Sequence, residues 1–377
     1  MDGVRRRQIA ALLLAYSEYR IYIVGQLERT MRGSKVPADT APRARRQDMA
    51  LSRRTVLAGA SALPLASFAR RAAAQEATIN AVHFTPAQVS YARSFLKYVE
   101  KVNQRGKGIV QIRVRGGPEV IPFTQLGEAL KNGVIDMADC PAGPLLNIVP
   151  EGEVFSATSK KPWELRENGG FELIDGIFAK KANAHVLAHV DAGAGFHVFT
   201  VDEPARTADG GVDFSRLKIR SAALYREFLE SLGAGVVVQP PGEAYTSLER
   251  GLVNANCYTV LGYQNFGWNK FTRYRIDPGF FQTDVLIMVN RTAWERLGPE
   301  ARKLLQDVAI EHERASYEEN LAGTREQGQQ MIDAGMKVIE LQGAARTAYL
   351  EKASRVSWER LAKRDPSRIA ELRAKFA

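Results

Sequence analysis

Segments with the pattern of β-strands alternate with segments of helical periodicity from Thr78 onward, and this alternation constrains the fold more than any other feature. Ile79–Phe84 is a short apolar run typical of a buried strand, whereas apolar residues between Tyr91 and Val102 recur at helical spacing. The two patterns continue to alternate towards the C-terminus. Because neighbouring parallel strands need a crossover helix between them, the sequence predicts an α/β protein with mainly parallel sheets.

One short pattern occurs twice along the chain. Residues 130–136 (LKNGVID) and 248–254 (LERGLVN) each end a helix, pass a glycine and enter an apolar segment. We expect strands at Val134–Ala138 and Leu252–Asn256, one in each of two similar sheets. The length of 377 residues is enough for two cores, so two lobes are predicted.

The positive charge of the chain lies almost entirely before residue 75. The formal net charge is +10, and residues 1–74 account for +9 of it, with 14 basic and 5 acidic side chains. The remaining 303 residues are close to neutral. They offer no excess charge that would attract phosphate, so we expect no nucleic-acid partner.

An export signal is predicted within residues 49–74. The twin arginine Arg53-Arg54 precedes 13 mildly apolar residues, too few to span a bilayer, and small residues before Gln75 fit a cleavage site at Ala74/Gln75. This segment resembles a twin-arginine translocation signal, which delivers a folded protein to the bacterial periplasm. The alternative is a basic amphipathic arm. We expect Met49 to be the native start and residues 1–48 to be a non-native extension, or else a disordered cytoplasmic one.

Motifs for catalysis are incomplete or missing from the sequence. Residues 193–198 (GAGFHV) match part of the dinucleotide-binding G-x-G-x-x-G pattern but continue as a strand where that pattern needs a helix. The sequence contains no P-loop and no nucleophile elbow. His185 and His189 lie in a strand pattern without converging zinc ligands. We therefore expect a binding protein and no enzyme, with Cys140 and Cys257 as free, buried thiols in different lobes.

Residues 217–251 indicate which binding protein this is. They contain Leu217-Lys218-Ile219-Arg220, then Leu232-Gly233-Ala234, then Gly242-Glu243-Ala244-Tyr245 with Leu248 and Gly251. The combination resembles the solute-binding proteins of tripartite ATP-independent periplasmic (TRAP) transporters, the DctP-type family, and the resemblance extends from Thr78 to about Lys363. It implies a two-lobed α/β fold with a central cleft and a long helix, Pro299–Ile332, that spans both lobes. Lobe I is expected to comprise residues 75–195 plus 283–323, and lobe II residues 196–282 plus 324–377.

The resemblance also implies where the substrate binds. Arg220 stands where relatives grip a substrate carboxylate, which a guanidinium binds with two parallel donors; the alternative for Arg220 is an ordinary ion pair. His197 stands where many relatives have a second arginine. We therefore expect a monocarboxylate to bind more tightly than a dicarboxylate, whose binding would strengthen as His197 gains a proton.

A third part of the implied site is the segment that ends at Tyr258. Cys257 replaces the glutamate that metal-binding relatives carry, so we predict no metal and no cofactor. The other expected substrate contacts are aromatic rings or lie in loops after strands, where ligands of α/β sheets bind. Together with Arg220 and His197, the expected contacts are Phe84, Glu119, Tyr225, Asn256, Cys257 and Tyr258.

The sequence thus predicts a monomeric extracytoplasmic receptor that closes on an organic acid in the cleft between its lobes. The resemblance implies that it delivers this acid to the small and large membrane subunits of a TRAP-type permease. The alternatives are a periplasmic ligand sensor of the same fold and a periplasmic enzyme exported in folded form.

Overall fold

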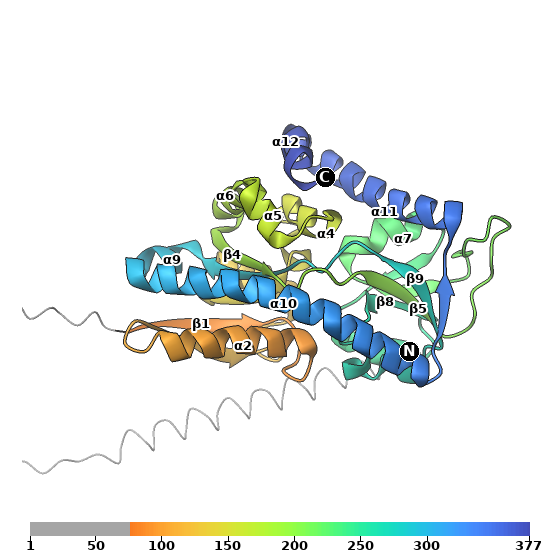
Figure 1. The fold of residues 1–377 in the computed structure, drawn as a ribbon, viewed down its shortest axis with the longest axis horizontal. Helices are drawn as coiled ribbons and strands as arrows, with labels where there is room; N and C mark the ends of the chain where they lie inside the picture. Colours follow the sequence, from red (N-terminus) through yellow and green to blue (C-terminus); the bar gives the residue numbers. More distant parts are fainter. Residues whose placement is uncertain (1–75) are drawn as a thin grey trace, which may run out of the picture. The chain divides into compact units, whose positions relative to one another are not determined.

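The computed structural model describes residues 76–377, so the predicted signal peptide and upstream extension lie outside the described residues. The chain forms two β-sheets, each with helices packed against it (Figure 1). The helices are α2 (Ser90–Arg105), α3 (Leu126–Lys131), α4 (Val154–Ala157), α5 (Pro162–Glu167), α6 (Gly170–Ala182), α7 (Arg226–Ser231), α8 (Ala244–Glu249), α9 (Arg291–Arg296), α10 (Pro299–Asp333), α11 (Gly343–Arg364) and α12 (Ile369–Phe376). Within residues 76–377, no helix combines the length and apolarity that a membrane span requires.

The first sheet has the strand order β2-β1-β3-β10-β4. β1 pairs in parallel with β2 and β3, whereas β10 runs antiparallel between β3 and β4. β10 is buried at every position and β4 at all but one, as expected for strands covered on both faces. The strands are β1 (Ala77–His83), β2 (Val110–Gly116), β3 (Met137–Pro141), β4 (Ala184–Val190) and β10 (Val285–Asn290).

The second sheet has the strand order β11-β9-β5-β8-β6-β7. β5 runs antiparallel to β8 and β9, and the other neighbours are parallel. The α/β class is confirmed. In the described part of the chain five of the nine strand pairings are parallel, and the four antiparallel pairings all involve β5 or β10, each of which directly follows a crossing between the sheets. The strands are β5 (Phe196–Thr200), β6 (Lys218–Ser221), β7 (Gly235–Val238), β8 (Ala255–Thr259), β9 (Tyr274–Phe280) and β11 (Lys337–Glu340).

The repeated pattern folds alike in both sheets, but its strands begin later than expected. β3 and β8 start at Met137 and Ala255, three residues after the predicted starts at Val134 and Leu252. Val134 and Leu252 are exposed, and each donates its N–H to the carbonyl oxygen of the residue five positions earlier, which closes the preceding helix. Val134 and Leu252 therefore belong to the turn that ends the helix, whereas the apolar pattern predicts them as the first residues of the strand.

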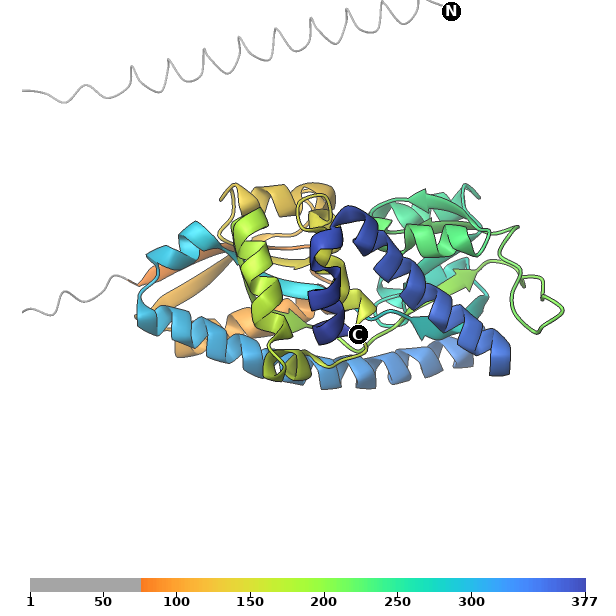
Figure 2. The same cartoon turned by 90° about the horizontal axis from the view of Figure 1, so that it is seen from above.

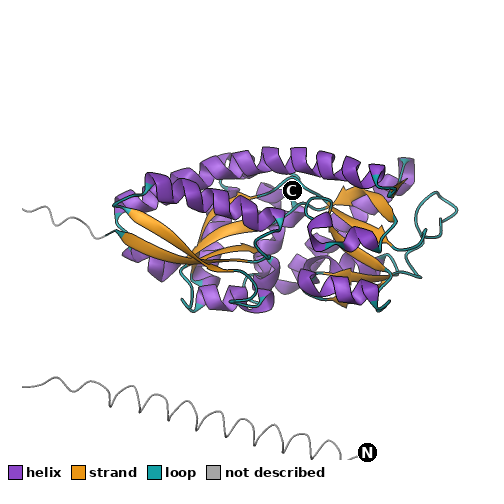
Figure 3. Ribbon diagram, turned by 90° about the horizontal axis from the view of Figure 1, so that it is seen from below, coloured by secondary structure: helices purple, strands orange, loops and turns teal. Residues whose placement is uncertain are grey.

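The chain crosses between the sheets at residues 191–195, at residues 281–284 and along α10, which runs past both sheets (Figures 1 and 3). α12 returns to the helices beside the first sheet and packs on α4 and α6 (Figure 2), with the rings of Phe376 and Phe155 6.0 Å apart. The lobe boundaries expected from the sequence stay a prediction.

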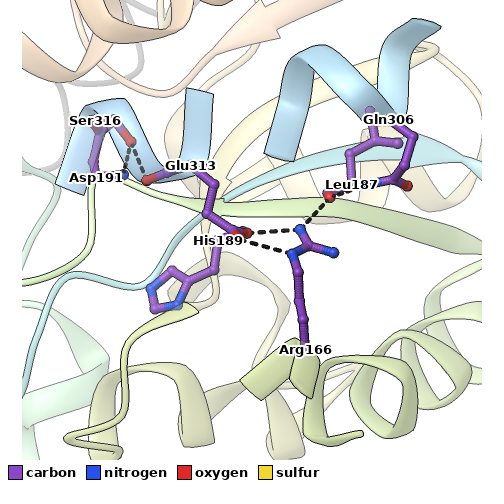
Figure 4. Close-up of polar contacts among 7 residues, drawn as sticks. All are labelled: Arg166, Leu187, His189, Asp191, Gln306, Glu313 and Ser316. Carbon is purple, nitrogen blue, oxygen red and sulfur yellow. Dashed lines mark hydrogen bonds and ion pairs between the residues drawn. The ribbon is translucent and has the colours of Figure 1, made fainter. Parts of the chain in front are cut away.

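A buried ion pair fixes α10 to the first sheet (Figure 4). Glu313 of α10, with a side chain 2% exposed, accepts hydrogen bonds of 2.8 Å from Nε and Nη2 of Arg166 in α5. It also accepts a hydrogen bond of 3.0 Å from the backbone N–H of His189 in β4. One turn further along α10, the hydroxyl oxygen of Ser316 accepts a hydrogen bond from the backbone N–H of Asp191, where the first crossing begins. These contacts hold the crossing against the long helix.

Removing the positive partner of Glu313 should destabilise the fold. Arg166→Met keeps an apolar stem but leaves a buried carboxylate without its cation, so we expect the free energy of unfolding to fall by about 3–5 kcal/mol. Urea denaturation measures this loss. The control is Arg105→Met, which breaks the exposed pair with Glu311 on the same helix and should leave the midpoint nearly unchanged. Equal losses in both variants would show that Arg166–Glu313 has no special role.

Candidate functional site

A cavity with about 50 Å³ of free volume lies between the two sheets. The wall on the side of the first sheet includes Phe84, Tyr91, Phe123, Pro141 and Asp284. The wall on the side of the second sheet includes Phe196, Arg220, Ala222, Tyr225 and Tyr258. Most of these side chains are apolar or aromatic, so the few polar groups decide which ligand chemistry fits.

Arg220, the third residue of β6, is 1% exposed and lines the cavity. Its Nε donates a hydrogen bond of 3.0 Å to the carbonyl oxygen of Gln239, and its Nη1 donates one of 3.5 Å to that of Cys257. These carbonyls orient the guanidinium without neutralising it. Burial lowers the pKa of Arg220 below its ordinary value, yet a guanidinium remains charged near neutral pH.

No carboxylate within residues 76–377 forms an ion pair with Arg220. The ionisable groups that influence it there are the hydroxyls of tyrosines, such as Tyr225 and Tyr258, and the thiol of Cys257. Burial raises the pKa of these groups, so they are neutral near pH 7. A buried charge without a counter-ion is costly. An anion in the cavity would supply this counter-ion.

Hydrogen bonds connect the two sides of the cavity. The hydroxyl of Tyr91 in α2 lies 2.8 Å from the hydroxyl of Thr259 at the end of β8, and both residues line the cavity. Next to them, the hydroxyl of Ser90 donates a hydrogen bond of 3.1 Å to the side-chain oxygen of Asn265. The two walls are thus in direct contact beside the cavity.

The structure brings together four of the eight residues expected at the substrate site. Arg220, Phe84, Tyr225 and Tyr258 all line the cavity. Their role as substrate contacts stays a prediction. The cavity also includes residues that sequence analysis did not single out for the site, namely Tyr91, Phe123, Pro141, Phe196 and Asp284.

The other four expected residues lie outside the cavity lining. Glu119 is exposed, and its Oε1 accepts a hydrogen bond of 2.7 Å from the backbone N–H of Gly117. Asn256 and Cys257 are fully buried within β8. Strand alternation explains His197: Phe196 faces the cavity, so His197 points to the other face of β5, where its Nδ1 lies 2.7 Å from Oδ1 of Asp277. This geometry does not support a second substrate cation at His197.

Both cysteines are free and buried, as expected. Cys140 lies in β3 of the first sheet and Cys257 in β8 of the second.

Sequence analysis did not predict Asp284 as a site residue. Of the residues that it missed, Asp284 matters most for the chemistry of the cavity. It is 3% exposed and directly precedes β10, and Oδ2 accepts a hydrogen bond of 3.0 Å from the backbone N–H of Ala142. Burial raises the pKa of Asp284 to about 7. The available signal was a polar residue immediately before an apolar strand, but only an antiparallel β10 brings the start of that strand to the cavity.

Comparison with known proteins gives one family. The sequence profile of DctP, described as bacterial extracellular solute-binding protein, family 7, matches residues 81–365. A relative named solute-binding protein, from Chromohalobacter salexigens, is 23% identical over 273 residues, which cover 68% of this chain and 77% of the relative.

Solved structures show the same fold. An extracytoplasmic solute receptor of Bordetella pertussis that binds pyroglutamic acid superposes with a TM-score of 0.69 at 16% identity, covering 79% of this chain and 99% of the receptor. A TRAP periplasmic solute-binding protein of Desulfovibrio salexigens with bound orotic acid also gives a TM-score of 0.69, at 18% identity, and the match covers 80% of this chain and 97% of that one.

The raised pKa of Asp284 predicts a pH-dependent gain in stability for Asp284→Asn. Between the unfolded pKa of 3.8 and the folded pKa of about 7, the folded chain binds more protons than the unfolded chain. Ionisation of Asp284 therefore opposes folding increasingly as the pH rises through this interval. Asparagine cannot ionise, so the variant should gain stability over the wild type by up to about 1.4 kcal/mol per pH unit. Urea denaturation at pH 4 and pH 8 should show no gain at the lower pH and the full gain at the higher.

Asp277→Asn is the control with the opposite sign. Burial by itself raises the pKa of Asp277, but hydrogen bonds from His197 and Arg275 outweigh it and lower the pKa to about 2. The ionised form therefore stabilises the fold, and the variant should be less stable than the wild type at pH 8. A gain at pH 8 for this variant, or none for Asp284→Asn, would contradict the assignment.

Proposed function

The chain belongs to family 7 of the bacterial extracellular solute-binding proteins, the DctP family, and from this membership we propose that it binds a small monocarboxylic acid between its two sheets. Proteins of this family are receptors and not enzymes. The ligand's carboxylate would meet the guanidinium of Arg220, and its remainder would contact the aromatic rings of the cavity.

The observation that carries the proposal is the buried, unpaired charge of Arg220. A carboxylate matches a guanidinium in charge and geometry, and in a closed cavity the pair is shielded from water. Arg220 is also the one cationic side chain among the described residues that line the cavity. A second carboxylate on the ligand would find no cation there, and for this reason we favour a monocarboxylate over a dicarboxylate.

The similar solved structures support the same ligand class. The Bordetella pertussis receptor binds pyroglutamic acid, and the Desulfovibrio salexigens protein holds orotic acid. Both ligands are compact ring compounds with one carboxylic acid group. With 16% and 18% identity, these proteins share the fold with this chain, and the ligand class is our inference.

A TRAP-type permease with a small and a large membrane subunit is the partner that we propose for the loaded receptor, which would act as a monomer. The family is extracellular, and the twin-arginine segment at Arg53-Arg54 provides a route for export in folded form. Cleavage at Ala74/Gln75 would release a mature chain that starts at Gln75.

Arg220→Ala should abolish most of the affinity while leaving the fold intact. The acid is first chosen by a thermal-shift screen of mono-, di-, oxo- and aromatic carboxylic acids, because a bound ligand raises the melting temperature. Loss of one partner of a buried charge pair costs about 2–5 kcal/mol of binding free energy, so calorimetric titration should show at least a thirtyfold weaker dissociation constant.

Arg226→Ala is the matched control for Arg220→Ala. Arg226 lies nearby on α7, where its side chain is 57% exposed and paired with Glu230, and its removal should leave binding unchanged. An affinity of Arg220→Ala within about threefold of the wild type would remove Arg220 from the site.

Replacing the twin arginine should block export. Arg53→Lys with Arg54→Lys keeps the positive charge, so a loss of periplasmic protein would identify the twin-arginine route and not a general basic requirement. N-terminal sequencing of the wild-type periplasmic protein should begin near Gln75. Exported protein that retains residues 1–48 would contradict Met49 as the native start.

A further inference from the structure

The cavity has a carboxyl group on the wall opposite Arg220. Asp284 belongs to the crossing that enters the first sheet, whereas Arg220 belongs to the second sheet, and both line the same cavity. The two residues do not form an ion pair with each other, and the cavity is the space that both of them line. A ligand that fills this space can contact both.

The protein itself satisfies Asp284 only in part. A backbone N–H, that of Ala142, donates to Oδ2, and within residues 76–377 no lysine, arginine or histidine forms an ion pair with this carboxyl group. The nearby hydroxyl of Tyr91 is engaged with Thr259. A carboxylate has room for about four hydrogen bonds, and a buried one that lacks donors is costly. A donor in the cavity would relieve this cost.

We propose that Asp284 accepts a hydrogen bond from a nitrogen of the ligand, so that the ligand is a small acid that also carries an N–H group, as in an amino acid or a lactam acid. The inference rests on the proposed function and names the ligand class of the same site. Arg220 holds the carboxylate on one wall, and Asp284 selects the donor on the other. Burial of Asp284 supports this role, because an acceptor shielded from water discriminates strongly against ligands without a donor.

Two pairs of shape-matched acids test the proposal on the wild-type protein. L-Proline is paired with cyclopentanecarboxylate, which lacks the charged nitrogen. L-Pyroglutamate is paired with its lactone analogue, in which oxygen replaces the ring N–H. Calorimetric titration should show that the N–H member of at least one pair binds about tenfold or more tightly than its partner. The pair that responds tells whether the donor is cationic or neutral.

Asp284→Asn should reduce the advantage of the N–H acid over its donor-free partner, with both affinities measured on the variant, to within about threefold. The control is Asp139→Asn, which changes a fully buried carboxyl group of the first sheet that does not line the cavity. This control should keep the preference of the wild type.

The outcomes separate this inference from the proposed function. Equal binding of both members in both pairs overturns the role of Asp284, and Arg220-dependent binding of the donor-free acids then leaves the proposed function standing. The same role is overturned if Asp284→Asn weakens both members of a pair equally, or if Asp139→Asn removes the preference as well. If no carboxylic acid binds at all, the proposed function fails and this inference fails with it.

Discussion

Arg220 is held in place by backbone carbonyl oxygens and has no carboxylate partner in the described part of the chain. The two other buried arginines there are treated differently. Arg275 binds Asp277 through two hydrogen bonds of 2.8 Å, and Arg360 binds Glu153. The described part of the chain thus neutralises its other buried guanidinium groups and leaves that of Arg220 without a counter-ion beside a cavity.

The rest of the architecture places Arg220, in the second sheet, opposite a cavity wall that the first sheet forms. β1 and β3 of the first sheet and β6 and β8 of the second end at the cavity, and β5 and β10 begin there because the chain has just crossed from the other sheet. The crossings are fastened to each other, since the backbone N–H of Thr283 donates to the carbonyl oxygen of Ala194 at 2.9 Å. α10 is tied to the first crossing through Asn320 and Ser316, which contact the backbone of Asp191.

Both crossings contain a non-glycine residue in the left-handed region of backbone conformation. Asp191 and Phe281 each have φ of 53°. Such residues persist only where surrounding contacts hold them, and they concentrate at ligand clamps and switches. In this fold the hydrogen bonds of the crossings with each other and with α10 are contacts of this kind.

The alternation of strand and helix patterns is local, and it was sufficient to predict the α/β class and the position of the long helix. The segment around Arg220 was sufficient for the family, because its spacing is carried by consecutive residues. β9 escaped prediction because Asp277-Pro278-Gly279 interrupts its apolar pattern with residues typical of turns. The sequence also predicted β3 and β8 to start too early, because an apolar residue can end a helix as well as begin a strand.

Side-chain direction depended on tertiary structure. Whether His197 or Phe196 faces the cavity is decided by the pairing of β5 with β8 and β9, since a shift of one residue reverses every side chain of a strand. Asp284 reaches the cavity only because β10 runs antiparallel in the first sheet, which no local pattern specifies. The sequence by itself therefore determined the class and the family and singled out Arg220 as a candidate, whereas the residues of the opposite cavity wall were decided by contacts between segments far apart in the chain.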